Sequence, residues 1–202
     1  MKRIRVTSRA DLEAFKRGFE ARAGNHVSIQ YLAASDVYAY RSNRQLVAGY
    51  VIHSECQHRF FDLMDQIGWE QIRALPGKQE DFCEITCMWM EPDVRSFPLR
   101  VRFYTSCTLQ TFFKRRRFII GGTKIDAVAQ MQRYCLPNVL FEGATENAIG
   151  NGNWTIYYGT PWSFAKGFVR LFVRESLKLL STDQVSSTVE NQVEVIEQKK
   201  AA

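Results

Sequence analysis

Apolar side chains recur along the first part of the chain at two different spacings, which predict strands and helices in turn. Residues 2–6 alternate basic and apolar residues, as a short strand does, and residues 27–32 fit a short strand or a loop. Between them, residues 9–23 predict an amphipathic helix because their apolar residues stand three to four positions apart. Ser8 precedes this helix as an expected N-cap, with Asp11 three residues further on.

The middle of the chain predicts a hairpin, a connecting segment and a long buried strand. Residues 36–53 hold two strand-like runs around a polar turn, and Gly49 in the second run indicates a bulge or a close backbone approach. Residues 56–67 have helical spacing within the connection. Residues 82–90 form an apolar, sulfur-rich run that contains one acid, Glu84, and we expect a strand there.

The second half of the chain alternates helices and strands. The predicted elements are a helix over 98–113, a strand over 118–120, a helix over 123–134, and strands over 139–141 and 154–158. This alternation, together with the hairpin, predicts an α/β fold built on a mixed sheet. Residues 161–180 fit a helix, although residues 168–174 fit a strand equally well. We expect one domain over residues 1–180 and a C-terminal helix or flexible tail over residues 181–202.

The composition is that of a single globular domain. The 202 residues are 46% hydrophobic and 24% charged, which is ordinary for such a domain. The sequence has no apolar run of the roughly 18 residues that a membrane-spanning helix needs, and no signal-peptide core follows its first basic residues. We therefore expect a cytoplasmic protein. The five cysteines lack CxxC spacing and indicate free thiols, and the three histidines lack paired spacing, so we predict no metal site.

The net charge of +6 favours an acidic partner. Positive charge is concentrated in one cluster, which consists of Lys114, Arg115, Arg116 and Arg117. The cluster is most simply the solvated C-terminal end of the predicted helix, where cations complement the helix dipole, and its sharper interpretation is a docking patch for an acidic protein. Nucleic acid is the less favoured partner, because no recognised binding motif accompanies the cluster.

Residues 83–102 join the long strand to the following helix and carry three arginines. The helix is expected to begin at Pro98, in a position where proline is well tolerated. Arg95 lies in the preceding turn, and Arg100 and Arg102 lie in the first turns of the helix. A strand that delivers a basic loop to a helix N-terminus is suited to holding a phosphate group.

The order of elements over residues 2–160 resembles the GNAT acyltransferase superfamily. The segment MWMEPDVRSFPLR is similar to the end of that family's central strand and its pyrophosphate loop, with Pro98 and Arg100 in place of two small residues. The segment FIIGGTKIDAVAQMQRYCLPNVLFEG resembles the following strand–helix–strand, and VYAYRSNRQLVAGYVIH resembles the family's hairpin. The resemblance implies a central mixed sheet whose central strands splay apart, flanked by helices.

Within the superfamily, the layout looks closest to acyl-homoserine-lactone synthases and N-acyl amino acid synthases. Those members also place extra residues between the hairpin and the central strand, as residues 54–80 do here. The strand CEITCMWM is similar to their Glu-x-Ser-Arg strand: Glu84 matches, Thr86 is a mild change and Cys87 replaces the arginine. Their N-terminal Arg-Phe/Trp-Asp signatures are absent from this sequence, which argues against homoserine-lactone synthesis itself.

The resemblance implies an N-acyltransferase that moves an acyl group from a phosphopantetheine thioester to the amine of a small molecule such as an amino acid. The thioester donor would be acyl-CoA or an acyl group on a carrier protein. Glu84, in an apolar strand where burial strengthens a carboxylate as a base, would accept the proton of the amine, and Tyr134 would protonate the leaving thiolate. The donor site would consist of Met88, Met90, Arg95, Leu99 and Arg100.

The loss of both small residues from the phosphate loop favours a single phosphate, as on a carrier protein, over a diphosphate. The basic cluster at residues 114–117 would then be the docking patch for an acidic acyl-carrier protein.

Structural alternatives stand beside these assignments. Glu84 could lie on the exposed face of a strand that is covered on one side only, and Tyr134 could pack on the core at a helix end. Arg95 could be a solvated turn residue. The altered phosphate loop also fits a GNAT-like fold that has lost catalysis and acts as a binding module.

Overall fold

The structure is a computed structural model of the 202-residue chain. The residues that it describes are 1–55, 58–64, 77–94, 96–145 and 152–174, with single positions at 70, 73 and 176. Among these residues, none of the helices combines the length and the apolar character that a membrane span requires.

The sheet has seven strands, and its two edges are formed by the first strand and the sixth. In spatial order the strands are β1 (Lys2–Val6), β2 (Asp36–Ser42), β3 (Gln45–His53), β4 (Phe82–Met90), β5 (Phe118–Thr123), β7 (Gly152–Gly159) and β6 (Asn138–Thr145). Strands β4 and β5 run parallel to each other, whereas every other neighbouring pair is antiparallel. The predicted α/β fold with a mixed sheet is therefore confirmed.

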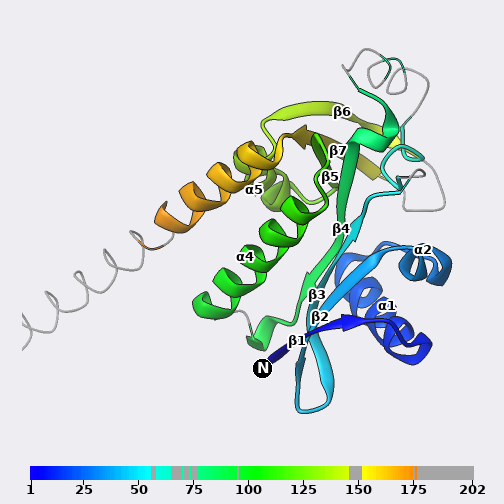
Figure 1. The fold of residues 1–202 in the computed structure, drawn as a ribbon, viewed down its shortest axis with the longest axis vertical. Helices are drawn as coiled ribbons and strands as arrows, with labels where there is room; N and C mark the ends of the chain where they lie inside the picture. The colour runs from blue at the N-terminus through cyan, green and yellow to red at the C-terminus, as the bar shows by residue number, and fades with distance from the viewer. Residues whose placement is uncertain are drawn as a thin grey trace, which may run out of the picture.

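Helices cover both faces of the sheet (Figure 1). They are α1 (Arg9–Ala23) and α2 (Ile29–Ala33) on one face, and α4 (Phe97–Phe113), α5 (Asp126–Cys135) and a helix over residues 161–174 on the other. Short 3-10 turns precede and follow β4, at η1 (Gln79–Asp81) and η2 (Pro92–Val94). The buried side chains consequently form separate apolar clusters, and the two main ones lie on opposite faces of β3 and β4.

Helix α1 forms as the sequence predicts. The Oγ of Ser8 accepts a hydrogen bond from the backbone N–H of Asp11 at 3.1 Å, which satisfies one of the free donors of the first turn. Gly24 ends the helix in the left-handed conformation, with φ of 62°. The next segment differs from expectation: Ser28 caps α2 by accepting from the N–H of Tyr31 at 3.0 Å, so a short helix forms where we predicted a strand or a loop.

The β2–β3 hairpin closes through Asn43 and Arg44, which both have positive φ, at 47° and 69°. This backbone twist matches the twist of the flanking strands in a two-residue hairpin. At Gly49 a side chain would collide with the ring of Phe15 and would lie 2.9 Å from the carbonyl oxygen of Tyr38. The close backbone approach predicted for this glycine is confirmed, because α1 can pack on the sheet only if the position has no side chain.

Strands β4 and β5 pair over three residues and then separate. Their last paired positions are Glu84 and Ile120, after which β5 continues beside β7. The predicted splay of the central strands is thus confirmed. Beyond the separation point β4 contains a bulge: Cys87 has a φ of 50°, and the register with β3 shifts between Gly49 and Val51.

Two other local predictions turn out differently. Residues 58–64, within the segment where we expected a helix, form turns. Residues 168–174 belong to the 161–174 helix, which resolves the choice between helix and strand in favour of helix. The C-terminal element expected over residues 181–202 lies outside the described residues.

Candidate functional site

Glu84 occupies the last position at which β4 still pairs with β5. Its side chain has no exposed surface, so the alternative of an exposed glutamate is wrong. Neither carboxyl oxygen has a hydrogen-bond partner within the described residues. The nearest ion-pair partner that the structure provides is His58, whose Nδ1 lies 3.6 Å from Oε2 of Glu84. A buried carboxylate with so little support is costly for folding, which marks this position as a candidate site of chemistry.

Two histidines stand beside Glu84. The Nε2 of His58 lies 3.1 Å from the carbonyl oxygen of Gln79. Because a carbonyl can only accept, Nε2 carries a proton and Nδ1 is directed at the carboxyl group. His53 is the direct cross-strand partner of Glu84 on β3. The two imidazole rings meet edge to face, with centroids 5.7 Å apart, so the carboxyl group shares a buried compartment with both.

Tyr31 covers this compartment from α2. Its ring lies against the ring of His53, with centroids 4.8 Å apart. Burial raises the pKa of the Tyr31 hydroxyl well above 10, and the negative charge of Glu84 raises it further. The phenol therefore stays neutral in the ordinary pH range and can donate a hydrogen bond. Its oxygen is buried and has no hydrogen-bond partner of ordinary geometry in the described structure.

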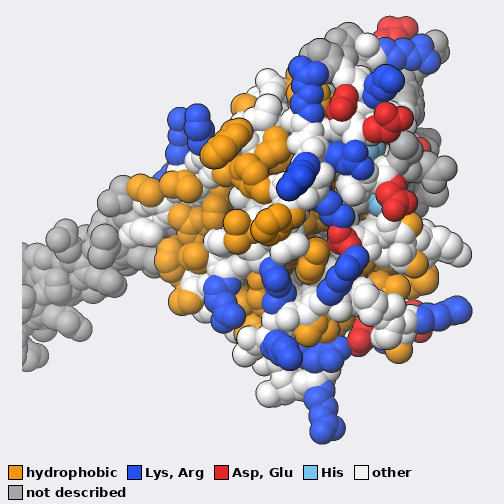
Figure 2. Space-filling model, in the orientation of Figure 1, with side chains coloured by type: hydrophobic (Ala, Val, Ile, Leu, Met, Phe, Trp, Pro, Cys, Tyr) orange, Lys and Arg blue, Asp and Glu red, His pale blue; other side chains and the backbone are white. Residues whose placement is uncertain are grey.

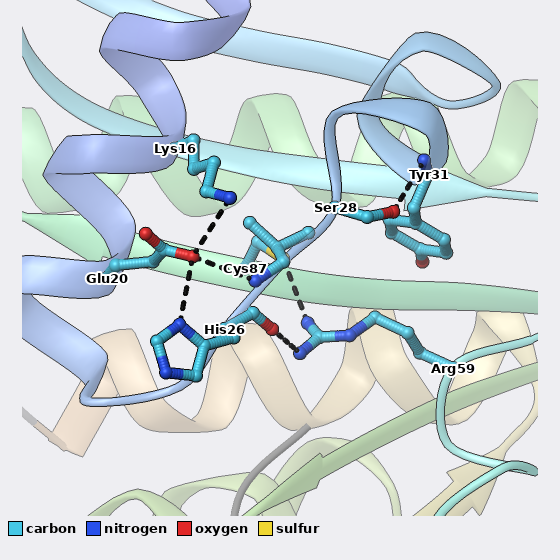
Figure 3. A network of polar contacts seen from close by, with 8 residues as sticks. Lys16, Glu20, His26, Ser28, Tyr31, Arg59 and Cys87 are labelled. Atoms are coloured by element: carbon cyan, nitrogen blue, oxygen red, sulfur yellow. Dashed lines mark hydrogen bonds and ion pairs between the residues drawn. The ribbon is translucent and has the colours of Figure 1, made fainter. Parts of the chain in front are cut away.

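Arg59 lies beside Tyr31 and Cys87, and its guanidinium is directed at Cys87 and at the backbone of His26 (Figure 3). One of its terminal nitrogens donates to the backbone carbonyl of His26 at 2.5 Å. The other donates to Thr86 Oγ1 at 3.4 Å and to Cys87 Sγ at 3.2 Å. The bulge explains how both residues can contact one guanidinium, since consecutive residues of a regular strand point to opposite faces. The guanidinium also lies 5.9 Å from the ring centroid of Tyr31.

Cys87 is a buried thiol and stays protonated. Burial raises its pKa from 9.0 to about 11, although the charge of Arg59 acts in the opposite direction. The strand resembles one in which N-acyl amino acid synthases carry an arginine at the position of Cys87. Here a guanidinium reaches the same place from residue 59, beyond the hairpin.

The predicted donor residues lie on and beyond the separated part of β4. Met88 and Met90 are partly buried and pack against the core cluster that contains Leu99. The side chain of Leu99 belongs to the core, so only its backbone could contact a phosphate. Arg100 is partly exposed in the first turn of α4. Arg95 lies outside the described residues.

The N-terminus of α4 has the features of an anion site. Ser96 occupies the N-cap position without a side-chain hydrogen bond, and the first turn contains no acidic residue. The backbone N–H of Arg100 is used by the carbonyl of Ser96 at 3.0 Å. Pro98 has no N–H, so Phe97 and Leu99 provide the remaining backbone donors of the first turn.

Tyr134 lies near the C-terminal end of α5 and is 45% exposed. Its hydroxyl accepts a hydrogen bond from Arg174 in the 161–174 helix at 2.6 Å. The structure therefore brings Tyr134 to that helix rather than to the compartment of Glu84. Gln132, two residues earlier, lies near β5: a Cβ at Gly121 of that strand would lie 3.9 Å from its Nε2.

The basic cluster at residues 114–117 is divided by the fold. Lys114 forms an ion pair with Asp36, and Arg116 donates to the carbonyl of Ser54 at 2.8 Å. Arg115 and Arg117 are exposed. Lys114 and Arg116 are thus partly engaged within the chain, and the docking patch of four side chains stays a prediction. On the face of the molecule drawn in Figure 2, Lys and Arg side chains lie at several separate places.

Four residues of the site escaped the sequence reasoning: Tyr31, His53, His58 and Arg59. Tyr31 stands in a short helix that we took for a strand or a loop, and the two last residues stand in the connection after β3. His53 offered one signal, since it ends a hairpin strand that neighbours the strand of Glu84. Spacing alone could not show that these residues meet.

The comparison with solved structures supports the fold. No protein-family model matches the sequence, and no curated protein matches it. Among solved structures, FeeM, an N-acyl amino acid synthase from uncultured soil microbes, matches with a TM-score of 0.63 at 9% identity, covering 81% of this chain and 92% of FeeM.

Two acetyltransferase structures also match. An N-acetyltransferase from Staphylococcus aureus Mu50 has a TM-score of 0.49 at 8% identity, covering 80% of this chain and 99% of the other. A ribosomal-protein-alanine N-acetyltransferase from Brucella melitensis has a TM-score of 0.49 at 10% identity, with coverages of 79% and 99%. The chain has the GNAT acyltransferase fold, as the order of its elements predicted.

Proposed function

We propose that this protein is an N-acyltransferase, which moves an acyl group from a phosphopantetheine thioester to the amine of a small molecule such as an amino acid. The observation that carries the proposal is the carboxyl group of Glu84, fully buried and without a hydrogen-bond partner among the described residues, at the point where β4 leaves β5. Acyl transfer to an amine needs a base at the place where the thioester is held.

The separated strands supply a place for the thioester. Beyond Glu84 and Ile120, the edge of β4 that faces β5 no longer pairs with that strand. Its backbone groups are available to the amide groups of a pantetheine arm, which binds in the manner of an added strand. Met88 and Met90 on β4 would line the arm, and unbranched side chains of this kind adapt to chains of different shape.

The phosphate of the donor would bind at the N-terminus of α4, where the uncapped first turn is positively polarised. Arg95 and Arg100 would add charge there. The bulk of Pro98 and Arg100 in this turn favours a single phosphate, as on a carrier protein, over the diphosphate of coenzyme A. In this proposal Arg115 and Arg117 are the exposed cations that attract an acidic carrier.

Tyr134 remains our proposed acid for the leaving thiolate. Its hydroxyl oxygen accepts from Arg174, which leaves its own proton available to the thiolate. An Arg174→Ala variant would remove the bond that orients this hydroxyl and should lower the transfer rate no more than Tyr134→Phe does. A loss of transfer in Arg174→Ala but not in Tyr134→Phe would remove Tyr134 from the mechanism.

Thiol release tests the proposal directly. The purified chain is mixed with acetyl-CoA, long-chain acyl-CoA or an acyl-carrier protein, each with a set of amino acids, and free thiol is followed over time. We expect release that depends on both donor and amine, and that falls at least a hundredfold in Glu84→Gln. Release that is unchanged in Glu84→Gln would reject Glu84 as the base, and no release with any donor would reject the enzymatic function.

A further inference from the structure

The reaction proposed above creates a problem of proton balance at Glu84. An ammonium group that becomes an amide loses two protons while the thioester bond breaks and the amide bond forms. One proton ends on the leaving thiol, and the other must pass from the base to the solvent in each turnover. Glu84 has no exposed surface, so this proton needs a route through the protein.

The groups around Glu84 offer such a route. His53 stands directly opposite Glu84 on the neighbouring strand, and side chains at directly opposed positions have Cβ atoms about 4.5–5.5 Å apart. The Nδ1 of His53 lies 2.9 Å from Oγ of Ser35. Ser35 in turn lines a polar cavity of about 350 Å³, which also contains Asp36, Ser54 and Lys114.

Hydrogen bonding fixes the tautomer of His53. Ser35 has one hydroxyl proton, and its Oγ donates that proton to the backbone carbonyl of Tyr31 at 2.6 Å. The contact between Ser35 and His53 must therefore use a proton on Nδ1 of the imidazole. Nε2 is left as a bare acceptor, buried and without a hydrogen-bond partner in the described structure. This is the arrangement of a proton relay, which accepts at one ring nitrogen and releases at the other.

We propose that His53 and Ser35 carry the proton from Glu84 to the polar cavity, and that this pair sets the rate at which the base is regenerated. This inference rests on the proposed transferase function. Glu84 and Nε2 of His53 are not hydrogen-bonded to each other in the described structure, so the two side chains first come into contact, and the Glu84 O–H bond then breaks as an Nε2–H bond forms on His53. The Nδ1–H bond breaks as Ser35 Oγ gains that proton, while the serine O–H turns from the carbonyl of Tyr31 and gives its own proton to water in the cavity. The imidazole is left with its proton on Nε2, and the ring turns to present an unprotonated nitrogen to Glu84 before the next turnover.

Burial keeps the imidazole of His53 neutral. Burial lowers the pKa of His53, and the charge of Glu84 opposes that effect. His58 and Lys114 lower it further, whereas Glu55 raises it. A neutral imidazole with an available Nε2 is therefore the form present near pH 7. His58 is a less suitable relay, because its Nε2 is already bound to the carbonyl of Gln79.

Two variants test the relay with the full chain, an acyl-carrier or acyl-CoA donor and an amino acid. Both His53→Gln and Ser35→Ala should lower kcat about tenfold to a hundredfold while leaving KM for donor and amine within about twofold. In His53→Ala, added imidazole should restore part of kcat, because the small base can replace the missing ring. His26→Gln alters an exposed histidine and serves as the control.

The outcomes separate the two proposals. Wild-type turnover that Glu84→Gln abolishes but that His53→Gln and Ser35→Ala preserve overturns the relay alone. Absence of wild-type turnover rejects the transferase function. Nitrogen-15 NMR of the imidazole gives a reading that needs no turnover: we expect the Nδ1–H tautomer for His53 in the free protein. A proton on Nε2 would overturn the relay even in an active enzyme.

Discussion

The two faces of β4 are built from opposite kinds of side chain. Toward α1 and α2 the strand presents Glu84, Thr86 and, through the bulge, Cys87, and these meet His58 and Arg59. Toward α4 the same strand presents only apolar groups, which join a cluster with the side chains of that helix; they include Cys83, Ile85, Met88, Leu99, Phe103 and Cys107.

The difference shows that one face of β4 holds the strand in the core, whereas the other face presents the polar groups of the candidate site. On the α4 face the buried side chains of β4 are apolar or neutral thiols, and the buried hydroxyls of Tyr50 and Ser106 beside them hydrogen-bond to each other at 2.6 Å, so packing and satisfied hydrogen bonds explain this face. On the other face, buried oxygen and nitrogen atoms lack partners among the described residues, which packing would not favour. The unsatisfied face is the one where chemistry is expected, and the satisfied face holds the strand in place.

The largest effect should separate Glu84 from its neighbour Cys83. Glu84→Gln should lower the transfer rate by roughly two to four orders of magnitude and leave the free energy of unfolding unchanged or higher, because an amide can donate to Nδ1 of His58. Cys83→Ala, on the opposite face, should lower the free energy of unfolding by about 1 kcal/mol and keep the rate. Denaturant titrations and rate measurements on both variants check these expectations. If Glu84→Gln lowers the free energy of unfolding as much as Cys83→Ala does, the two faces of β4 do not differ in the way described.

Alkaline pH should destabilise the fold through the thiols of both faces. Burial raises the pKa of Cys83 to about 12 and that of Cys87 to about 11, each from 9.0. Below pH 9 the folded and unfolded chains are both protonated and stability is unaffected. Above pH 9 the unfolded chain loses these protons first, so the free energy of unfolding falls as pH rises.

The slope should reach about 1.4 kcal/mol per pH unit for each thiol. Denaturant titrations at pH 7, 9 and 10.5 measure this slope, and Cys83→Ala should reduce it by the contribution of one thiol. A flat profile between pH 9 and 10.5 would show that these thiols ionise in the folded chain.

A smaller effect is expected from Arg59, which holds the polar face together. Arg59→Lys cannot reproduce a fork that reaches His26, Thr86 and Cys87 at once. It should lower the free energy of unfolding by about 2 kcal/mol. Arg9→Lys, in an exposed ion pair with Glu13, is the matched control and should change it by less than about 0.5 kcal/mol. Equal effects of the two substitutions would mean that Arg59 does not support the site.

The smallest effect concerns the outer end of α4. Reversing the charge in an Arg115→Glu and Arg117→Glu double variant should raise KM several-fold for an acyl-carrier donor and leave KM for acyl-CoA unchanged, because exposed charges mainly steer association. Titration of the donor at two salt concentrations measures this, and the difference should shrink at high salt. An equal change for both donors would remove the cluster from carrier recognition.

The sequence predicted what local pattern can encode. The spacing of apolar residues predicted α1, the hairpin and β4, and the single acid in a sulfur-rich strand singled out Glu84. Partners that arrive from distant segments were beyond such reasoning, because no periodicity connects Arg59 or Tyr31 to residue 84. The basic cluster shows the same limitation for surface residues. Nothing in its sequence indicates that Lys114 pairs with Asp36 or that Arg116 donates to the carbonyl of Ser54, because both partners come from distant segments.

Within the described residues no strand pairs with the outer edge of β1, which leaves a row of backbone donors and acceptors there. Such an edge is the usual starting point for strands of separate molecules to join. Three of the five residues in this strand are cations, Lys2, Arg3 and Arg5. Two copies that approached edge to edge would bring these charges together before any hydrogen bond formed. Repulsion between the like charges of two β1 strands thus opposes self-association, and salt in the solution screens that repulsion.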